Sequence, residues 1–483
     1  MIRTGSRSGI ATTWSVLAGL VMTATVLWAA GSPSTTASQS RGADWPQFMG
    51  PNRDCSSGEK GLLRQWPPGG PKELWRVKTG RGWSCPSIVG GDLYIPWSEI
   101  AGESGGENTE VLACLDAVTG KEKWRFTYKA VYAYSNWGVW FAFGVRSTPT
   151  VTPRHVFTIS LTGLMHGLDR KTGRMIWSKD LVDAYKPDVY EGNKGFPLSP
   201  IVSGNVVIVN LPTSSSAPTN TVHKVVGLDV DTGGQVWLFE MPHRPNTLMT
   251  QGHTPGLARF GPDECVVLQA ERVLLALRCA DGKEVWRSEH VKPGAGGSSL
   301  PTPLIIGNTI FHANIWEMAY LVEVDRSNPE FPTKVRWGKH LGMGISQCSN
   351  LAHWDGYLYG FRYGESPGLV GEKCSLMCVD LATGSIAWSR QKFAFSPSLI
   401  AADGLLFVRV YNGLLLLEAT PKGYVEKGAV AKLVDEVPSM KIGRMGLPAA
   451  AVDGGWTIPV LSRGRLYVRC PGNLICYQVA ANP

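Results

Sequence analysis

Charged residues are scarce in this sequence, at 18% of 483 residues, and they form no run of lysine and arginine. A basic run or stripe is the electrostatic footprint of a nucleic-acid binder, so the formal net charge of +8 does not indicate one. The chain also contains no H-E-x-x-H, Walker A or EF-hand sequence. It therefore lacks the signatures of zinc peptidases, P-loop nucleotidases and calcium-loop proteins.

Turn-forming and aromatic residues are abundant instead. The sequence contains 56 glycines, 32 prolines and 18 tryptophans. Many turns, many aromatic side chains and few charges favour an all-β protein over a helical or disordered one.

Residues 1–40 differ from the rest of the chain. Arg3 and Arg7 precede an apolar stretch from Ile10 to Ala30, and a Ser/Thr-rich spacer follows. This order is typical of a secretory signal, and the length of the apolar stretch is also compatible with an uncleaved membrane anchor. We expect an exported protein in the periplasm or cell envelope, with a signal peptide or anchor over residues 1–40.

One phrase, Asp-x-x-Thr-Gly-x-x-x-Trp, recurs along the remainder. Its four full copies contain Asp116, Gly120 and Trp124; Asp169, Gly173 and Trp177; Asp229, Gly233 and Trp237; and Asp380, Gly384 and Trp388. Degraded copies end at Trp286 and Trp337. Successive tryptophans are 53, 60, 49, 51 and 51 residues apart. A period near 50 in a turn-rich sequence predicts a β-propeller with one four-stranded sheet per period.

Each residue type in the phrase has a physical role in such a fold. Asp and Thr side chains bond to the backbone of a tight turn, and Gly provides a positive φ. The tryptophan then begins the next strand, where its large ring can fill the wedge between adjacent blades.

The number of blades follows from the places where they begin. Short apolar strands, most of them preceded by proline, begin near residues 84, 147, 198, 253, 301, 348, 396 and 457. The last period has only three strands, whereas the segment 72–78 has a strand with Trp75 and no blade of its own. We therefore predict an eight-bladed propeller over 72–483, closed by pairing this N-terminal strand with the strand around Ile475. Residues 41–71 form an N-terminal extension.

The ten cysteines suggest disulfides in an exported chain, but the repeats offer another interpretation. Two positions before the repeat aspartate stand Cys114, Gly167, Gly227 and Cys378. Because small residues share this column, we expect cysteine to act there as a small hydrophobic residue with a free thiol.

These phrases and strand starts resemble the quinoprotein, or PQQ-type, propeller repeat. The opening Asp44-Trp45-Pro46-Gln47-Phe48-Met49-Gly50-Pro51-Asn52-Arg53 is similar to the N-terminal phrase of an exported subgroup, often labelled PQQ-binding-like. The resemblance implies the fold for residues 44–480. Its motifs belong to the scaffold, so they imply little about chemistry.

The family that the chain resembles also includes PQQ-dependent alcohol dehydrogenases. These enzymes typically stack the cofactor beneath a disulfide between adjacent cysteines and bind Ca²⁺ beside a catalytic Asp. This chain has no Cys-Cys dipeptide and no C-x-x-C-H haem signature, and no residue here can be matched to the calcium ligands or the catalytic Asp. We predict no cofactor, with PQQ and Ca²⁺ as the alternative. We predict no metal site either, because His223, His243 and His253 do not have ligand spacing.

Two regions are candidates for ligand or partner binding. The segment 128–143 contains seven aromatic residues, including Trp137, Trp140 and Phe141, which either contact a protein or sugar or cap the end of the core. Polar residues at the innermost strand starts line the predicted channel and either bind a ligand or bond to water and neighbouring blades: Arg146, His253 and Gln347.

Three functions remain open at this point. The first is a non-catalytic binding or scaffold module outside the cytoplasm, with an unknown protein or carbohydrate partner and no nucleic acid. The second is a PQQ-dependent dehydrogenase whose usual cofactor residues are replaced. The third is a carbohydrate-associated accessory protein that uses the aromatic segment.

Overall fold

The structure is a computed structural model that describes residues 44–99, 106–132, 144–187, 195–213, 222–242, 253–270, 273–290, 302–313, 318–341, 350–363, 374–393, 397–435, 440–442, 445–447 and 457–481. The chain divides into two compact units, Met1–Ser40 and Arg41–Pro483, and every described residue belongs to the second. Within these ranges, no helix has the length and hydropathy needed to cross a bilayer.

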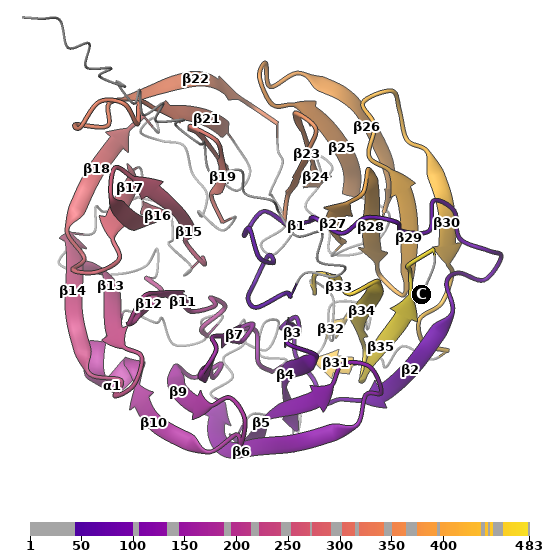
Figure 1. Cartoon of the computed structure of the whole chain (residues 1–483), viewed down its shortest axis with the longest axis horizontal. Helices are drawn as coiled ribbons and strands as arrows, with labels where there is room; N and C mark the ends of the chain where they lie inside the picture. The colour runs from indigo at the N-terminus through magenta and orange to yellow at the C-terminus, as the bar shows by residue number, and fades with distance from the viewer. Residues whose placement is uncertain are drawn as a thin grey trace, which may run out of the picture. The chain divides into compact units, whose positions relative to one another are not determined.

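The second unit is all-β, and its main sheets surround a common axis in chain order (Figure 1). Each sheet is one blade of an eight-bladed propeller, as predicted. Seven of the eight blades have four strands, and the remaining one, which is seventh in chain order, has five. A separate ribbon has two strands.

Blades one to four follow one another from residue 87 to residue 289. From the axis outwards their strands are β3 (Ser87–Val89), β4 (Asp92–Glu99), β5 (Gly106–Asp116) and β6 (Glu122–Tyr132); β7 (Thr150–Val151), β8 (His155–Ile159), β9 (Leu164–Asp169) and β10 (Met175–Asp180); β11 (Ile201–Ser203), β12 (Val206–Asn210), β13 (Val222–Asp229) and β14 (Gln235–Pro242); β15 (Gly256–Phe260), β16 (Asp263–Ala270), β17 (Val273–Arg278) and β18 (Glu284–Glu289). The short helix α1 (Leu181–Tyr185) follows β10.

Blades five to eight complete the ring. Their strands are β19 (Leu304–Ile306), β20 (Thr309–Ala313), β21 (Ala319–Val324) and β22 (Thr333–Lys339); β23 (Ala352–Trp354), β24 (Tyr357–Tyr363), β25 (Cys374–Asp380) and β26 (Ile386–Phe393); β27 (Ser398–Ala402), β28 (Leu405–Val410), β29 (Gly413–Glu418) and β30 (Glu426–Val430); β33 (Val460–Ser462), β34 (Arg465–Cys470), β35 (Asn473–Gln478) and β2 (Glu73–Lys78). The ribbon consists of β31 (Met440–Ile442) and β32 (Met445–Leu447).

The predicted closure of the ring is confirmed. The N-terminal strand β2 pairs antiparallel with the C-terminal strand β35, and Arg76 lies opposite Ile475. The eighth blade is therefore shared by the two ends of the chain, which removes an exposed sheet edge. The extension before β2 also joins the sheets, because β1 (Ser56–Ser57) adds a parallel strand to β27.

Five of the repeat tryptophans fill wedges between blades, because each of these five rings lies against the turn glycine of the next blade. A Cβ added at Gly173 would be 2.4 Å from the Trp124 ring, and both phrase glycines Gly173 and Gly233 have positive φ. The same close approach occurs for Gly120 with Trp75, Gly233 with Trp177, Gly282 with Trp237 and Gly384 with Trp337. A side chain at these glycines would displace the indole, so packing and backbone conformation both require glycine.

The column of small residues lies directly opposite these tryptophans. Cys114 pairs with Trp124, Gly227 with Trp237, and the other pairs are Gly167 with Trp177, Ala276 with Trp286, Cys378 with Trp388 and Cys476 with Trp75. The indole lies over the small residue, since a Cβ at Gly227 would be 2.3 Å from the Trp237 ring.

All nine cysteines in the described part of the chain are free and buried. Burial raises the pKa of the Cys85 thiol to about 11 and that of Cys476 to about 12. These thiols stay protonated at neutral pH, which agrees with a packing role.

Candidate functional site

The predicted site residues fall into two groups. Arg146 and His253 are described; each precedes the innermost strand of a blade, and they are 7% and 4% exposed. Trp137, Trp140, Phe141 and Gln347 lie outside the described residues. The candidate site is therefore the end of the central channel at which the innermost strands begin. We call this region the channel mouth.

Hydrogen bonds between successive blades encircle part of the channel mouth. The residue before the proline of one blade donates its backbone N–H to the side chain of its counterpart in the next blade. The bonds are Cys85 N to Thr148 Oγ1 at 3.1 Å, Thr148 N to Ser199 Oγ at 2.9 Å and Ser199 N to Thr254 Oγ1 at 2.9 Å. Ile458 N donates to Cys85 Sγ at 3.0 Å, so the series of bonds also crosses the closure from blade eight to blade one. We call this series of bonds between blades the hydrogen-bond belt.

A second set of bonds comes from polar residues in the apolar second strands. Asn210, Gln269, Arg409 and Arg469 are each at most 1% exposed. Each lies two residues after the strand position that pairs with the column of small residues, where blade seven has Leu416 instead of a small residue. Asn210 Nδ2 donates to the carbonyl of His253 at 3.0 Å, so this side chain links blade three to blade four. We call these four residues the polar staples.

Arg469 makes several hydrogen bonds beyond its own blade. Its Nη1 donates to Ser84 Oγ at 2.8 Å, Ser84 O at 3.2 Å and Pro96 O at 2.7 Å, and its Nη2 donates to Gly80 O at 3.1 Å. Arg409 Nε donates to Arg469 O at 3.0 Å. The two guanidinium groups therefore bond to backbone oxygens across the seams between blades seven, eight and one.

Arg146, in the segment before blade two, contacts Trp83, in the segment before blade one. Its guanidinium is 4.5 Å from the centroid of the Trp83 ring, a cation–π distance. His253 Nε2 accepts the backbone N–H of Gln269 at 3.3 Å. Both predicted channel residues thus contact protein groups at the channel mouth.

A buried chain of imidazoles crosses the seam between blades four and five. His312 Nδ1 is 2.9 Å from Gln269 Oε1, and His312 Nε2 is 2.7 Å from His290 Nε2. Burial lowers the pKa of His290 to about 4 and that of His312 well below its usual value, so both rings are neutral. Since Gln269 Oε1 can only accept, His312 accepts from His290, and His290 Nδ1 accepts from the Ser288 hydroxyl at 2.9 Å.

A buried carboxyl group joins blades one and two. Glu110 is fully buried and accepts bonds from Tyr128 Oη at 2.5 Å, Tyr132 Oη at 2.7 Å, Ser160 Oγ at 3.0 Å and Leu161 N at 3.2 Å. Burial raises the pKa of this carboxyl, and the four donors offset part of that effect. The arrangement is a strong inter-blade contact at the base of the aromatic segment.

The described residues show no cluster of metal-ligating side chains. No group of three His, Cys, Asp or Glu side chains within the described ranges could hold a metal ion. The polar staples and the residues of the hydrogen-bond belt form their hydrogen bonds with neighbouring blades.

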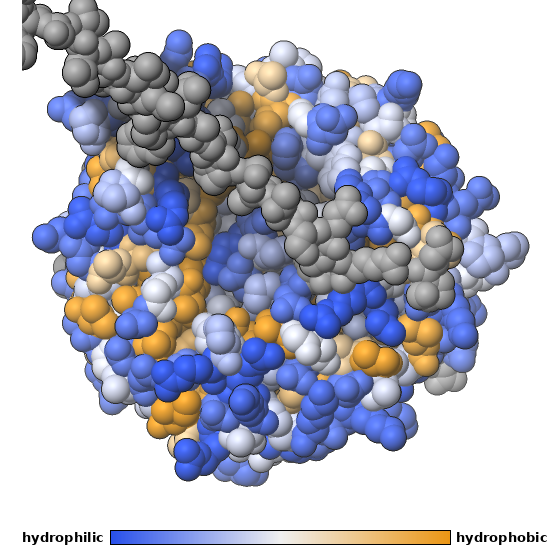
Figure 2. All heavy atoms as spheres, in the orientation of Figure 1, coloured by the Kyte–Doolittle hydropathy of each residue, from blue (hydrophilic) through white to orange (hydrophobic). Residues whose placement is uncertain are grey.

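The face seen in Figure 2 is hollowed near its middle, and hydrophilic residues gather in the hollow. Sequence reasoning identified Arg146 and His253 from their place at strand starts but missed the polar staples. Their signal is a single polar residue near the end of an apolar strand, as in Val206-Val-Ile-Val-Asn210.

Residues 107–390 match the family described as outer membrane protein assembly factor BamB, and no curated protein matches. Among solved structures, BamB from Moraxella catarrhalis is 14% identical with a TM-score of 0.56, over 84% of this chain and 99% of that one.

Two enzymes also have similar structures. Quinohemoprotein alcohol dehydrogenase from Comamonas testosteroni is 14% identical with a TM-score of 0.62, over 91% of this chain and 81% of that one. Quinohemoprotein alcohol dehydrogenase ADHIIG from Pseudomonas putida HK5 is 13% identical with a TM-score of 0.61 and the same coverage of 91% and 81%. Identities this low show the shared fold alone. The family match covers more than half of the sequence, and the chain belongs to the PQQ-type β-propeller family described as outer membrane protein assembly factor BamB.

Proposed function

We propose that this protein is a non-catalytic binding or scaffold module of the cell envelope that holds a protein partner. One observation carries the proposal. The buried polar groups at the channel mouth are used to join blades, as Arg469 does with four bonds to blade one. Groups committed to the scaffold in this way do not supply catalysis, because a catalytic group must reach substrate.

Membership of the BamB family supports the proposed envelope location and the protein partner. The second candidate is a PQQ-dependent dehydrogenase, which the similarity to two quinohemoprotein alcohol dehydrogenases favours. A carbohydrate ligand at Trp137, Trp140 and Phe141 is a further prediction. Arg146, His253 and Gln347 are proposed as the residues by which a small ligand would be recognised at the channel mouth.

The two main candidates are separated by adding PQQ and Ca²⁺ to the purified chain and recording the absorbance of the quinone and the reduction of an artificial dye. The scaffold proposal expects neither saturable binding nor turnover with alcohols. Saturable binding accompanied by dye reduction would replace it with the dehydrogenase.

Partner capture tests the scaffold directly. The tagged chain is cross-linked in its native envelope and the captured proteins are identified by mass spectrometry. The double variant Trp137→Ala, Trp140→Ala should lose a partner that the control Val118→Ala retains, since Val118 is an apolar residue of blade one that is 51% exposed. Equal capture by both variants would remove the aromatic segment from the proposal.

A further inference from the structure

Blade seven lacks the tryptophan that its position in the repeat requires. In β30, Gly428 pairs with Leu416, as Trp388 pairs with Cys378 in blade six. Gly428 has a φ of 153°, in a region that side chains rarely adopt. The wedge beside blade seven must therefore be filled by a residue from elsewhere in the chain.

Trp66 fills this wedge. A Cβ added at Gly428 would be 2.5 Å from the Trp66 Cβ, and Trp66 N donates to Lys427 O at 2.9 Å. The Trp66 and Phe407 ring centroids are 6.2 Å apart, compared with 6.3 Å for Trp388 and Tyr359 in blade six. Trp66 is 4% exposed and occupies the place of a repeat tryptophan.

The residues before Trp66 contact blades seven and eight at specific polar groups. The buried carboxylate of Glu59 accepts the backbone N–H groups of Arg463 at 2.6 Å and Gly464 at 2.7 Å, in the first hairpin turn of blade eight. Asp403, in the corresponding turn of blade seven, accepts Leu62 N at 3.2 Å through Oδ2. The chain is thus bound by a carboxylate at one blade and by a turn aspartate at the other.

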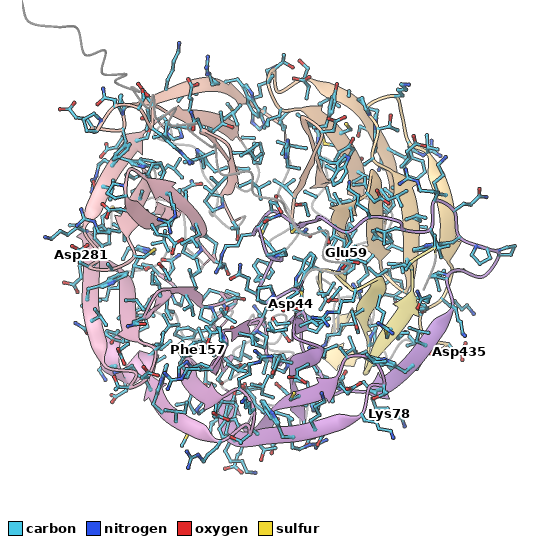
Figure 3. The ribbon with its side chains drawn as sticks, in the orientation of Figure 1. Asp44, Glu59, Lys78, Phe157, Asp281 and Asp435 are labelled. Atoms are coloured by element: carbon cyan, nitrogen blue, oxygen red, sulfur yellow. The ribbon has the colours of Figure 1, made fainter. Side chains whose placement is uncertain are left out.

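Backbone pairing aligns the same segment. Ser56 and Ser57 pair in parallel with Ala401 and Ala402 of β27, and Leu63 N donates to Val479 O at 2.8 Å. Figure 3 shows Asp44 near the axis of the ring and Glu59 on the side of blades seven and eight. The segment 56–66 therefore lies over the seam between blades seven and eight.

We propose that blades seven and eight form a binding site for an extended peptide with a carboxylate and, seven residues later, a tryptophan, and that the chain's own residues 56–66 occupy this site. The site has three recognition elements. These are the turn amides of Arg463 and Gly464 for the carboxylate, the open edge of β27 for the backbone, and the surface over Gly428 for the indole. The mode is strand addition with an aromatic anchor, and it is independent of the proposed partner of the protein.

The proposal is tested in the folded full chain. A protease recognition sequence is placed in the exposed turn Pro67–Gly69, the purified protein is cleaved, and retention of the N-terminal fragment is measured by gel filtration and mass spectrometry. We expect the fragment to remain bound after cleavage. The variant Trp66→Ala should release it at least about a hundredfold faster, because truncating a buried tryptophan removes a large anchor. Gln65→Ala is the control, since Gln65 is exposed on the same segment.

A synthetic peptide of residues 56–68 completes the test. In excess, it should displace the cleaved fragment, and peptides carrying Glu59→Gln or Trp66→Ala should not. Loss of the fragment on cleavage alone would overturn the proposal, as would equal release by Trp66→Ala and Gln65→Ala. A dimer in which the segment is exchanged between two copies would overturn the assignment of the occupant to the same chain.

Discussion

His166 offers a direct test of how the seam between blades one and two is built. Its side chain is 3% exposed, and it packs against Phe126 and Tyr128 with ring centroids 5.0 and 4.4 Å away. Neither ring nitrogen has a hydrogen-bond partner in the described structure. Burial alone lowers the pKa of His166 from 6.5 to about 4.

The sign and size of the pH effect follow from this shift. Below pH 6.5 the unfolded chain binds a proton at His166 that the folded chain does not, so acid favours unfolding until the pH reaches about 4. One pKa unit corresponds to about 1.4 kcal/mol, so lowering the pH from 7.5 to 4.5 should remove about 2.5 kcal/mol through this residue. The variant His166→Phe should lack that loss, and it should be at least as stable as the wild type at pH 7.5, because two unbonded polar atoms leave the core.

The measurement is the free energy of unfolding in urea at both pH values, for the wild type, His166→Phe and the control His340→Phe, which alters an exposed histidine. Other buried groups also respond to pH, including His290 and Glu110, so the comparison between variants isolates His166. If His166→Phe loses as much stability on acidification as the wild type and the control, the argument is refuted.

Three further substitutions test other contacts through urea unfolding. Arg469→Met leaves four oxygen acceptors of blade one without their donor and should cost at least about 3 kcal/mol; a cost below about 1 kcal/mol would contradict the staple role. Gly227→Val places a side chain 2.3 Å from the Trp237 ring and should cost about 3 kcal/mol, whereas Gly58→Ala, with open space around its added Cβ, should be nearly neutral. The raised pKa of Glu110 means that this carboxyl stabilises the fold at acid pH and that its contribution falls as the pH rises. The free energy of unfolding of Glu110→Gln, relative to that of the wild type, should therefore be more favourable at pH 7 than at pH 4. A difference that does not change with pH would exclude this role.

The sequence predicts the ring because its determinants repeat in register. Trp124, Trp177 and Trp237 recur with the same spacing from glycine, and the structure places each ring against the turn of the next blade. The closure was predictable for a related reason, since Trp75 has the repeat pattern and only three strands follow the last blade start.

The repeat does not predict the role of Trp66, because this residue lies in the N-terminal extension, outside every repeat period. The sequence shows that the segment around Gly428 has no tryptophan, but it does not show which distant residue fills the gap. That assignment depends on the path of the extension across blades seven and eight, which three-dimensional contacts alone reveal. The extension is therefore part of the packing of the ring.

The candidate site was only partly predictable because the two ends of each blade interface follow different rules. At the tryptophan end, one large ring fits one small partner, and the same solution recurs. At the channel mouth, the requirement is only that a buried polar side chain bonds to a neighbouring blade. Asn210 meets it with one donated amide bond, Gln269 by accepting from His312, and Arg469 with four donated bonds. Because side chains of different length and charge meet that requirement, these positions have no common letter in the sequence, and a search for repeats cannot find them. Each staple has its own set of hydrogen-bond partners, so substituting one staple for another should fail even though the four share a column.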